Sequence, residues 1–324
     1  MPRSGEMERR DAGAPSRLLV LRLSALGDVI HTIPAVVALR ERHPGVPLSW
    51  VVEAPYQELV ELVAGVEAIP VRLKKWGRAP LEFRDDIRRA LRTLRGTATS
   101  VDFQGLVKSA MLGWLSGAKL RFGFDSRAIR EKPALLFTNR KVAVDTAKHV
   151  VDQNLELAAA AGAELQPSAV PWERFPADPE GTLADLRGAT VLLPGAGKPN
   201  KLWPVERFRE LAKQIGPAAL VVWGPGERGL AEAIGGRIAP PTNLRELASV
   251  LQHARVVVGA DTGPLHLAAA LGTTVVGLYG PTDPRRNGPY GQVTHCIERY
   301  HSTKLMESIT VEEVVNALRK VNAW

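Results

Sequence analysis

Cysteine is nearly absent from this chain of 324 residues: Cys296 is the single one, so no internal disulfide framework can form. Neither Cys-x-x-Cys spacing nor clustered His and Cys residues suggest a structural metal. No apolar run approaches the roughly 20 residues needed to span a bilayer. Residues 1–16 are polar, with three arginines and without the apolar segment of a signal peptide. These absences predict a disordered tail over residues 1–16 and a cytoplasmic protein.

Two common nucleotide-binding signatures are also missing. The glycine-containing loop at residues 194–204 has no Gly-Lys-Ser or Gly-Lys-Thr ending, so it is not a Walker loop. No Gly-x-Gly-x-x-Gly follows the first predicted strand, which counts against a nicotinamide-dependent dehydrogenase.

Positive charge is abundant but unevenly distributed. Residues 72–95 contain nine basic and three acidic residues and therefore carry six of the chain's eight net positive charges. Such a cluster is often only a solvated helix face. The alternative is a partner rich in phosphate or carboxylate, either nucleic acid or an anionic membrane surface. Near an anionic leaflet each Lys or Arg contributes about 1 kcal/mol, enough for the cluster to dock the protein reversibly.

Apolar strands alternate with helices along the chain, which predicts an α/β fold with parallel sheets covered on both faces. The N-terminal half has predicted strands at 17–23, 48–53, 68–71, 98–103 and 119–124, and helices at 29–42, 55–64, 80–94, 106–115 and 147–161. The C-terminal half has strands at 189–194, 218–223, 255–258 and 273–278, and helices at 205–215, 227–234, 244–253, 264–271 and 311–320. A proline-rich linker at 166–188 separates two expected domains, 17–165 and 189–324, with the last helix a candidate to pack back on the first domain.

The strongest signal for a binding site follows the predicted strand at 255–258. Asp261-Thr-Gly-Pro-Leu-His266 opens a helix with proline at its first position, where the missing N–H group is tolerated. The unpaired N–H groups and the helix dipole there favour an anion, with Asp261 and Thr262 at the rim and His266 in the first turn. The alternative is a helix cap with a buried histidine.

A carboxylate follows the first strand in Ser24-Ala-Leu-Gly-Asp28. At a helix start Asp28 can act as a cap, and the helix dipole stabilises its charged form. It can also accept a proton from an incoming hydroxyl group, provided that partial desolvation raises its basicity. Both roles are open from the residues alone.

Two further loops follow strands in the C-terminal half. Gly195-Ala-Gly197 exposes backbone N–H groups, and Lys198 and Lys201 behind it suit a phosphate group or face solvent. Trp223-Gly-Pro-Gly-Glu227 ends in a carboxylate that can cap a helix or bind a ribose diol. Ligands of doubly wound sheets bind at the carboxyl ends of the strands, so these loops together outline a nucleoside diphosphate.

With these motifs the chain resembles the glycosyltransferase family 9 heptosyltransferases, over about residues 17–320, and most of all their type I branch. The matching runs are Leu-Ser-Ala-Leu-Gly-Asp-Val-Ile-His-Thr-Ile-Pro (23–34), Trp-Val-Val-Glu (50–53), Asp-Phe-Gln-Gly-Leu-Val-Lys-Ser-Ala (102–110), Lys-Leu-Trp-Pro (201–204), Asp-Thr-Gly-Pro-Leu-His-Leu-Ala-Ala-Ala (261–270) and Leu-Tyr-Gly-Pro-Thr-Asp-Pro (278–284). In one run, Pro194-Gly-Ala196, the chain is more similar to the type II branch.

This resemblance implies a GT-B fold, in which two Rossmann-like doubly wound domains hold the active site in the cleft between them. It implies an inverting transfer of L-glycero-D-manno-heptose from ADP-heptose to the Kdo inner core of lipid A in lipopolysaccharide biosynthesis. No cofactor and no metal bound by an Asp-x-Asp motif are expected, and nucleic acid is not an expected partner. The enzyme is expected to associate peripherally with the cytoplasmic face of the inner membrane.

The resemblance also assigns roles to residues. Asp28 corresponds to the general base. The donor is assigned Lys201 for the diphosphate, Glu227 for the ribose, Thr242 on the adenine side, and Asp261, Thr262, Gly263 and His266 for the heptose phosphate. The anionic acceptor is assigned Lys74, Lys75 and Arg130, with Gln104 and Lys108 nearby. Two alternatives stay open: a family 9 enzyme with another acceptor or nucleotide sugar, and a non-catalytic nucleotide- or polyanion-binding protein on the same scaffold.

Overall fold

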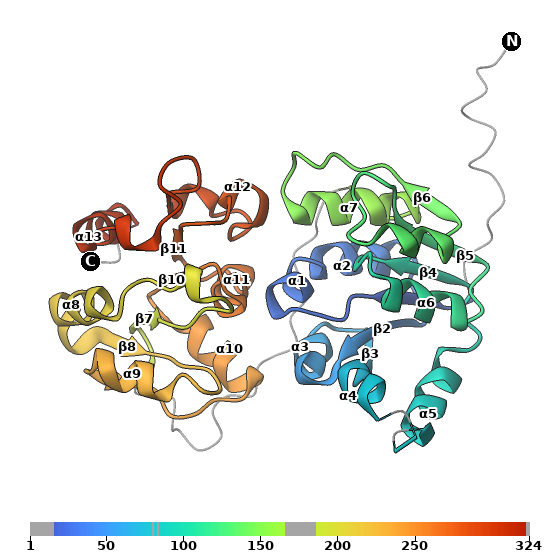
Figure 1. Ribbon diagram of the computed structural model, residues 1–324, viewed down its shortest axis with the longest axis horizontal. Helices are drawn as coiled ribbons and strands as arrows, with labels where there is room; N and C mark the ends of the chain where they lie inside the picture. Colours follow the sequence, from blue (N-terminus) through green and yellow to red (C-terminus); the bar gives the residue numbers. More distant parts are fainter. Residues whose placement is uncertain (1–15, 80, 83, 166–185, 322–324) are drawn as a thin grey trace, which may run out of the picture. The chain divides into compact units, whose positions relative to one another are not determined.

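The computed structural model describes residues 16–79, 81–82, 84–165 and 186–321, and this part of the chain forms two compact units (Figure 1). Unit 1 comprises the described residues within Met1–Ser24, Thr32–Asp145 and Gln153–Pro171. Unit 2 comprises those within Ala25–His31, Thr146–Asp152 and Trp172–Trp324. Apart from Ser16, the expected tail lies outside the described residues, as do residues 166–185 of the expected linker.

Unit 1 is built on a parallel six-stranded sheet of order β3-β2-β1-β4-β5-β6. Its strands are β1 (Leu18–Leu21), β2 (Leu48–Glu53), β3 (Glu67–Val71), β4 (Thr99–Asp102), β5 (Leu120–Phe124) and β6 (Arg140–Val142). The first strand pairs with β2 on one side and β4 on the other, so the strand order reverses at β1. This is the predicted doubly wound arrangement.

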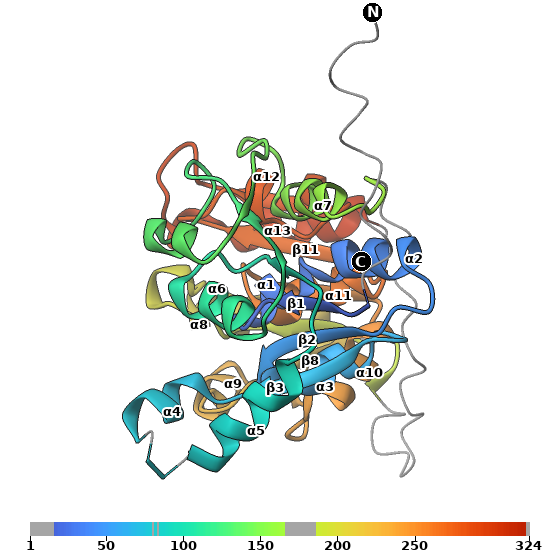
Figure 2. The ribbon, with the colours of Figure 1, turned by 90° about the vertical axis from the view of Figure 1, so that its right-hand side faces the viewer.

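The helices of unit 1 cover the sheet. They are α2 (Ile33–Arg42), α3 (Gln57–Glu61), α4 (Leu73–Arg78), α5 (Arg84–Leu94), α6 (Val107–Leu115) and most of α7 (Val150–Ala160). On one face of the sheet, Leu19 and Leu21 of β1 pack in one hydrophobic cluster with Trp76, Leu94 and Leu112. Because these three side chains belong to α4, α5 and α6, those helices cover the same face (Figure 2).

The predicted helix at 29–42 is wrong in one respect, because the structure has two helices there. Helix α1 (Leu26–Ile30) ends before His31, and α2 begins at Ile33. Pro34 causes the break: it has no N–H group to donate to Ile30, and its ring would collide with that carbonyl in a continuous helix. In the first turn of α2 the same proline is tolerated. The break allows α1 to belong to unit 2 while α2 remains in unit 1.

Unit 2 repeats the doubly wound plan with a parallel sheet of order β12-β11-β10-β7-β8-β9. Its strands are β7 (Thr190–Leu193), β8 (Ala219–Val221), β9 (Arg237–Ile238), β10 (Val256–Ala260), β11 (Val275–Tyr279) and β12 (Cys296–Glu298). The strand order reverses between β7 and β10, where Leu192 pairs with Val258. The short edge strands β6, β9 and β12 were not predicted, because each has too few apolar residues to show a period.

The helices of unit 2 are α1, α8 (Val205–Ile215), α9 (Arg228–Ile234), α10 (Leu244–Gln252), α11 (Gly263–Ala270), α12 (Pro284–Asn287) and α13 (Val311–Lys320). The last of them, α13, packs its apolar face within unit 2. Its residues Val314 and Leu318 share a buried cluster with Phe208 of α8 and Val276 of β11. Together the two units give an α/β architecture of two parallel six-stranded sheets.

Candidate functional site

At the point where the sheet of unit 2 reverses its order, the loops after β7 and β10 are joined by an ion pair. Lys201 ends a short 3-10 helix (Pro199–Lys201) that follows β7, and Asp261 directly follows β10. The Nζ atom of Lys201 lies 2.5 Å from Oδ2 of Asp261, and the two side chains are only 20% and 10% exposed. The two residues that sequence reasoning selected for a phosphate site are therefore in direct contact.

The second oxygen of the Asp261 carboxylate faces His266 in the first turn of α11. The distance from Nε2 of His266 to Oδ1 of Asp261 is 3.0 Å. Burial alone would raise the pKa of Asp261, but hydrogen bonds from His266 and Lys201 and their positive charge outweigh burial and lower it to about 2. Asp261 is thus a carboxylate at any physiological pH.

Several buried polar atoms at this edge of the sheet have no hydrogen-bond partner among the described residues. They are the hydroxyl oxygens of Thr262, Tyr279 and Thr282 and the Nδ1 atom of His266. Buried polar groups in folded proteins are nearly always paired. Thr262 follows β10, and Tyr279 and Thr282 lie at and after the end of β11. The carboxyl ends of β10 and β11 therefore hold hydrogen-bonding groups that no described residue satisfies.

Two glycines allow α1 to lie directly against the start of α11. A Cβ atom at position 27 would come within 2.9 Å of Cδ2 of His266. A Cβ atom at position 263 would come within 2.6 Å of the Leu26 side chain. Each helix thus presents a glycine to a side chain of the other, and the close approach requires both.

This packing brings α1, the helix that carries Asp28, against the helix that follows Asp261. Asp28 is the third residue of α1, and its side chain is half-buried. Its Oδ2 atom accepts a long hydrogen bond of 3.4 Å from the N–H group of Ala25. Asp28 thus lies one residue beyond Gly27, the position that packs against His266, and it belongs to the same unit as the loops after β7 and β10.

Sequence reasoning missed His31, which packs beside His266, and His149, which packs beside His31. The ring centroid of His31 lies 4.4 Å from that of His266 and 5.3 Å from that of His149. All three side chains are buried. His149 accepts a hydrogen bond at Nδ1 from the N–H group of Val151, so its Nε2 carries the proton and donates to the Gly288 carbonyl at 3.0 Å. Burial lowers the pKa of His149, which keeps the ring neutral.

His31 has a sequence signal, since it follows α1 in the same run as Asp28. His149 has none, because its partner His31 is far away along the chain.

The loop after β8 also lies at the carboxyl edge of the sheet of unit 2, and it contains Glu227. The Oε2 atom of Glu227 accepts a hydrogen bond of 2.8 Å from the N–H group of Gly224, and Glu227 is the N-cap residue of α9. Any side chain at position 195 would overlap with the Glu227 carboxylate. The loops after β7 and β8 thus meet at Gly195, and a larger residue there would require the Glu227 carboxylate to move. Thr242 is half-buried just before α10.

In unit 1, three of the residues selected for the acceptor lie around Gly105. The Gln104 side chain is buried, and its Oε1 atom accepts hydrogen bonds from the N–H groups of Leu23 and Ser24 at 2.9 and 3.2 Å. Gln104 therefore fixes the end of the first strand. Lys108, on α6, is half-buried, and Arg130 is exposed. The backbone N–H group of Glu131 donates to the Gly105 carbonyl at 3.0 Å, which brings the Arg130 loop to the start of α6.

The remaining two acceptor residues, Lys74 and Lys75, lie on α4. Lys75 is exposed, and the side chain of Lys74 is outside the described part of the structure.

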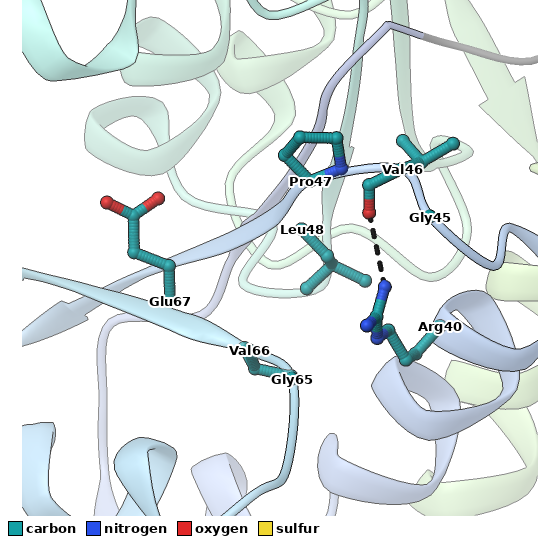
Figure 3. A pocket seen from close by; sticks show the side chains of 8 residues that line it. All are labelled: Arg40, Gly45, Val46, Pro47, Leu48, Gly65, Val66 and Glu67. Carbon is teal, nitrogen blue, oxygen red and sulfur yellow. Dashed lines mark hydrogen bonds between the residues drawn. The ribbon is translucent and has the colours of Figure 1, made fainter.

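A pocket in unit 1 lies elsewhere in the fold. Its lining includes Leu48 and Glu67, which begin β2 and β3, so it opens at the amino ends of the strands. Figure 3 shows the Arg40 side chain reaching toward the Val46 carbonyl, a hydrogen bond of 3.3 Å. The guanidinium group also lies against Gly65. Because ligands of doubly wound sheets bind at the carboxyl ends, this pocket is not a candidate site.

Comparison with known proteins gives consistent matches. The model of glycosyltransferase family 9 (heptosyltransferase) matches residues 87–314. Lipopolysaccharide heptosyltransferase 1 of Escherichia coli (strain K12) is 33% identical over 296 residues, covering 85% of this chain and 91% of that protein. The structure of E. coli heptosyltransferase WaaC with ADP superposes with a TM-score of 0.82 at 29% identity, covering 94% of this chain and 99% of that one. The same enzyme with ADP-2-deoxy-2-fluoro heptose gives a TM-score of 0.79 at 28% identity, with the same coverage.

Proposed function

The chain belongs to glycosyltransferase family 9, the heptosyltransferase family, and we propose that it transfers L-glycero-D-manno-heptose from ADP-heptose to the Kdo inner core of lipid A. The chain spans nearly the whole of a lipopolysaccharide heptosyltransferase 1 at 33% identity. Two of the solved structures similar to it carry ADP and a fluorinated analogue of ADP-heptose. The observation in this structure that carries the proposal is the contact of Lys201 and His266 with Asp261 at the start of α11.

The donor diphosphate is proposed to bind where the loops after β7 and β10 meet. Lys201 supplies a cation, and the first N–H groups of α11 face the same place with the positive end of the helix dipole. Lys201 must share its ammonium group between Asp261 and the phosphate oxygens when the donor binds. Thr262, Gly263 and His266 complete the heptose-phosphate contacts in this proposal. Glu227 binds the ribose, and Thr242 lies on the adenine side.

The proposed reaction is a single displacement with inversion. An acceptor hydroxyl oxygen forms a bond to the anomeric carbon of heptose as the bond from that carbon to the phosphate oxygen breaks. The hydroxyl proton passes to the carboxylate of Asp28, and ADP departs with the bonding electron pair. Lys201 and the α11 start stabilise the negative charge that develops on ADP, as fixed dipoles at a leaving group do. His31 acts as a positioning residue because its ring packs on that of His266, and His149 acts through His31, on which its own ring packs.

The acceptor is proposed to bind through unit 1. Lys74, Lys75 and Arg130 supply positive charge for the anionic sugar, and Lys108 lies beside the Arg130 loop. Gln104 contributes by holding the end of the first strand. Among the described residues, no helix is long and apolar enough to cross a membrane. We place the enzyme in the cytoplasm, bound peripherally to the inner membrane, because its proposed acceptor is a membrane glycolipid.

The decisive experiment measures ADP release from ADP-heptose with and without a Kdo-lipid acceptor. Release only when the Kdo acceptor is present supports the proposal. ADP release that requires an acceptor already carrying one heptose would identify a type II enzyme. The Pro194-Gly-Ala196 run, which is more similar to the type II branch, favours this alternative. Turnover of another nucleotide sugar in place of ADP-heptose would identify a family 9 enzyme with a different donor. Tight ADP binding without turnover on any acceptor identifies a non-catalytic binding protein.

A further inference from the structure

Helix α6 of unit 1 carries apolar side chains on both of its faces. Leu112 and Gly113 are buried, and a Cβ atom at position 113 would meet the Leu21 side chain of β1, so this side of α6 lies on the sheet. Met111, Trp114 and Leu115 lie on the opposite face and are 39%, 53% and 39% exposed. A helix that is apolar all round is normally enclosed by a protein core or by lipid. Apart from Lys108 at its start, the outer face of α6 therefore lacks the polar side chains expected of a helix that faces only water.

A neighbouring segment extends this apolar surface. The 3-10 helix η3 (Lys132–Leu136) packs against α6, and its last residue, Leu136, is 83% exposed. The ring of Phe137, the next residue, lies with its centroid 6.1 Å from that of Trp114. We call Met111, Trp114, Leu115, Leu136 and Phe137 the α6 patch. Contiguous exposed apolar side chains with a polar rim mark interaction surfaces.

The rim of the α6 patch is strongly basic. Residues 107–142 contain eight Lys and Arg residues but only two acidic residues. Lys108 lies three residues before Met111 on α6, and Lys132 begins η3 and is exposed. Both acidic residues are already engaged. Asp125 pairs with Arg127 at 3.0 Å, and Glu131 accepts a hydrogen bond of 2.8 Å from the N–H group of Val107.

We propose that the α6 patch is the surface by which the enzyme docks on an anionic lipid bilayer. The apolar side chains enter the boundary between headgroups and acyl chains, and Lys108 and Lys132 contact the anionic headgroups. Trp is suited to this boundary because its large apolar ring carries one polar N–H group. Apolar insertion combined with basic residues is the usual chemistry of reversible membrane binding. A second copy of the chain fits less well, because two such basic rims would repel each other.

This proposal rests on the proposed function insofar as a glycolipid acceptor brings the enzyme to a membrane. It locates the contact on α6 and η3, outside the basic segment at 72–95 that the sequence singles out.

The first test is co-sedimentation of the full chain with vesicles of phosphatidylglycerol and phosphatidylcholine, compared with vesicles of phosphatidylcholine alone. Wild-type protein should bind the anionic vesicles preferentially. The double variant Trp114→Ser, Leu136→Ser should lower the partition coefficient by at least about tenfold, since two apolar side chains no longer leave water. Lys132→Ser should lower it by about fivefold. Leu305→Ser is the matched control, since Leu305 is 49% exposed in unit 2 and outside the patch.

The second test shows whether the patch touches lipid directly. Vesicles of brominated phosphatidylglycerol should quench part of the tryptophan fluorescence of the wild-type protein. Trp114→Phe keeps an apolar ring, so this variant should still sediment with the vesicles. It should lose most of the quenching, although the other six tryptophans of the chain remain. Unchanged quenching in Trp114→Phe would show that the membrane contact lies elsewhere.

The outcomes separate this proposal from the proposed function. ADP release with a soluble, de-acylated acceptor should be the same for wild type and for Trp114→Ser, Leu136→Ser. If the double variant binds vesicles as strongly as the wild type, the proposed docking surface is wrong and the transferase proposal is unaffected. Vesicle binding that depends on the patch, in a protein inactive on every acceptor, would overturn only the transferase proposal. A dimer in sedimentation velocity that the double variant dissociates would assign the patch to a second copy of the chain.

Discussion

Gly27 of α1 packs so closely on His266 of α11 within unit 2 that a Cβ atom at position 27 would lie only 2.9 Å from Cδ2 of the ring. The His266 ring cannot simply move away, because it is 4% exposed and lies between Asp261 and the ring of His31. Asp28, the next residue, is held by this contact against the helix that follows Asp261. The contact thus links the proposed base to the proposed donor site.

Gly27→Ala should therefore lower both stability and turnover. The added methyl group forces the His266 ring or α1 to shift, and overpacking of this kind destabilises proteins by about 1–3 kcal/mol. The measurement is urea unfolding together with the rate of ADP release. Gly77→Ala is the control, because nothing lies within 4 Å of its Cβ position on α4 and alanine favours a helix. Equal stability of Gly27→Ala and wild type would show that α1 can move away from α11.

Asp28→Asn tests the base. Asparagine can still accept the hydrogen bond from Ala25, so the midpoint of thermal unfolding and ADP affinity should change little. The rate constant for heptose transfer should fall by about 100-fold or more, because the amide cannot take up the hydroxyl proton. If single-turnover measurements give a near-normal rate, Asp28 only supports the start of α1 and another group removes the proton.

Lys201→Ala should weaken ADP and ADP-heptose binding selectively. A charge-assisted hydrogen bond to phosphate contributes about 1.5–3 kcal/mol, which corresponds to a loss of roughly 10- to 100-fold in affinity by calorimetry. The acceptor KM should stay close to the wild-type value. Lys198→Ala is the matched control, since Lys198 is an exposed lysine in the same loop. A loss shared equally by donor and acceptor would indicate a displaced loop instead of a missing phosphate contact.

Asp102 of β4 should make stability depend on pH. Burial outweighs the hydrogen bonds from Gly105, Gln104 and Ser109 and the charge of Arg22, and it raises the pKa of Asp102 from 3.8 to about 6. Between about pH 4 and 6 the folded protein therefore holds a proton that the unfolded chain releases. The contribution is largest below pH 4 and is lost as the pH rises through 6, so raising the pH from below 4 to above 7 should remove about 3 kcal/mol of unfolding free energy.

Asp102→Asn should make the free energy of unfolding less dependent on pH in this range. The variant cannot titrate, and its amide oxygen can still accept from the N–H groups of Gln104 and Gly105. Urea unfolding at several values between pH 4 and 7 compares the two proteins. The same slope in both would mean that Asp102 is ionised in the fold throughout this range.

Lys75→Ala, Arg130→Ala should raise the acceptor KM and leave ADP affinity unchanged, since the proposed donor contacts lie in unit 2. The increase should shrink as salt is added, because attraction between exposed charges is screened with a Debye length of about 8 Å at physiological ionic strength. Lys213→Ala, Lys320→Ala removes the same charge from exposed positions of α8 and α13 and is the control. An equal increase in the acceptor KM of both variants would show that the increase depends only on the net charge of the protein.

Much of the fold could be predicted because its signals are local. A continuous apolar run such as Val256–Ala260, followed by Asp-Thr-Gly-Pro, determines a buried strand and the start of a helix within a dozen residues. The positions of Lys201, Glu227 and Asp261 after strands followed from the same pattern. Local signals failed at Pro34, where the apolar period continues across a break, and at the short edge strands, where Arg140-Lys-Val142 shows no apolar period.

The sequence by itself determined which residues end each strand, and therefore which side chains are available at the carboxyl edges of the two sheets. Only the tertiary structure decided that α1 packs on α11, that His31 lies beside His266 and His149 beside His31, and that Lys201 pairs with Asp261. Strand and helix signals depend on neighbours a few residues apart. These contacts join residues separated by 60 to more than 200 positions, and they form only where shape permits, as at Gly27 and Gly263, which leave room for the side chains of His266 and Leu26.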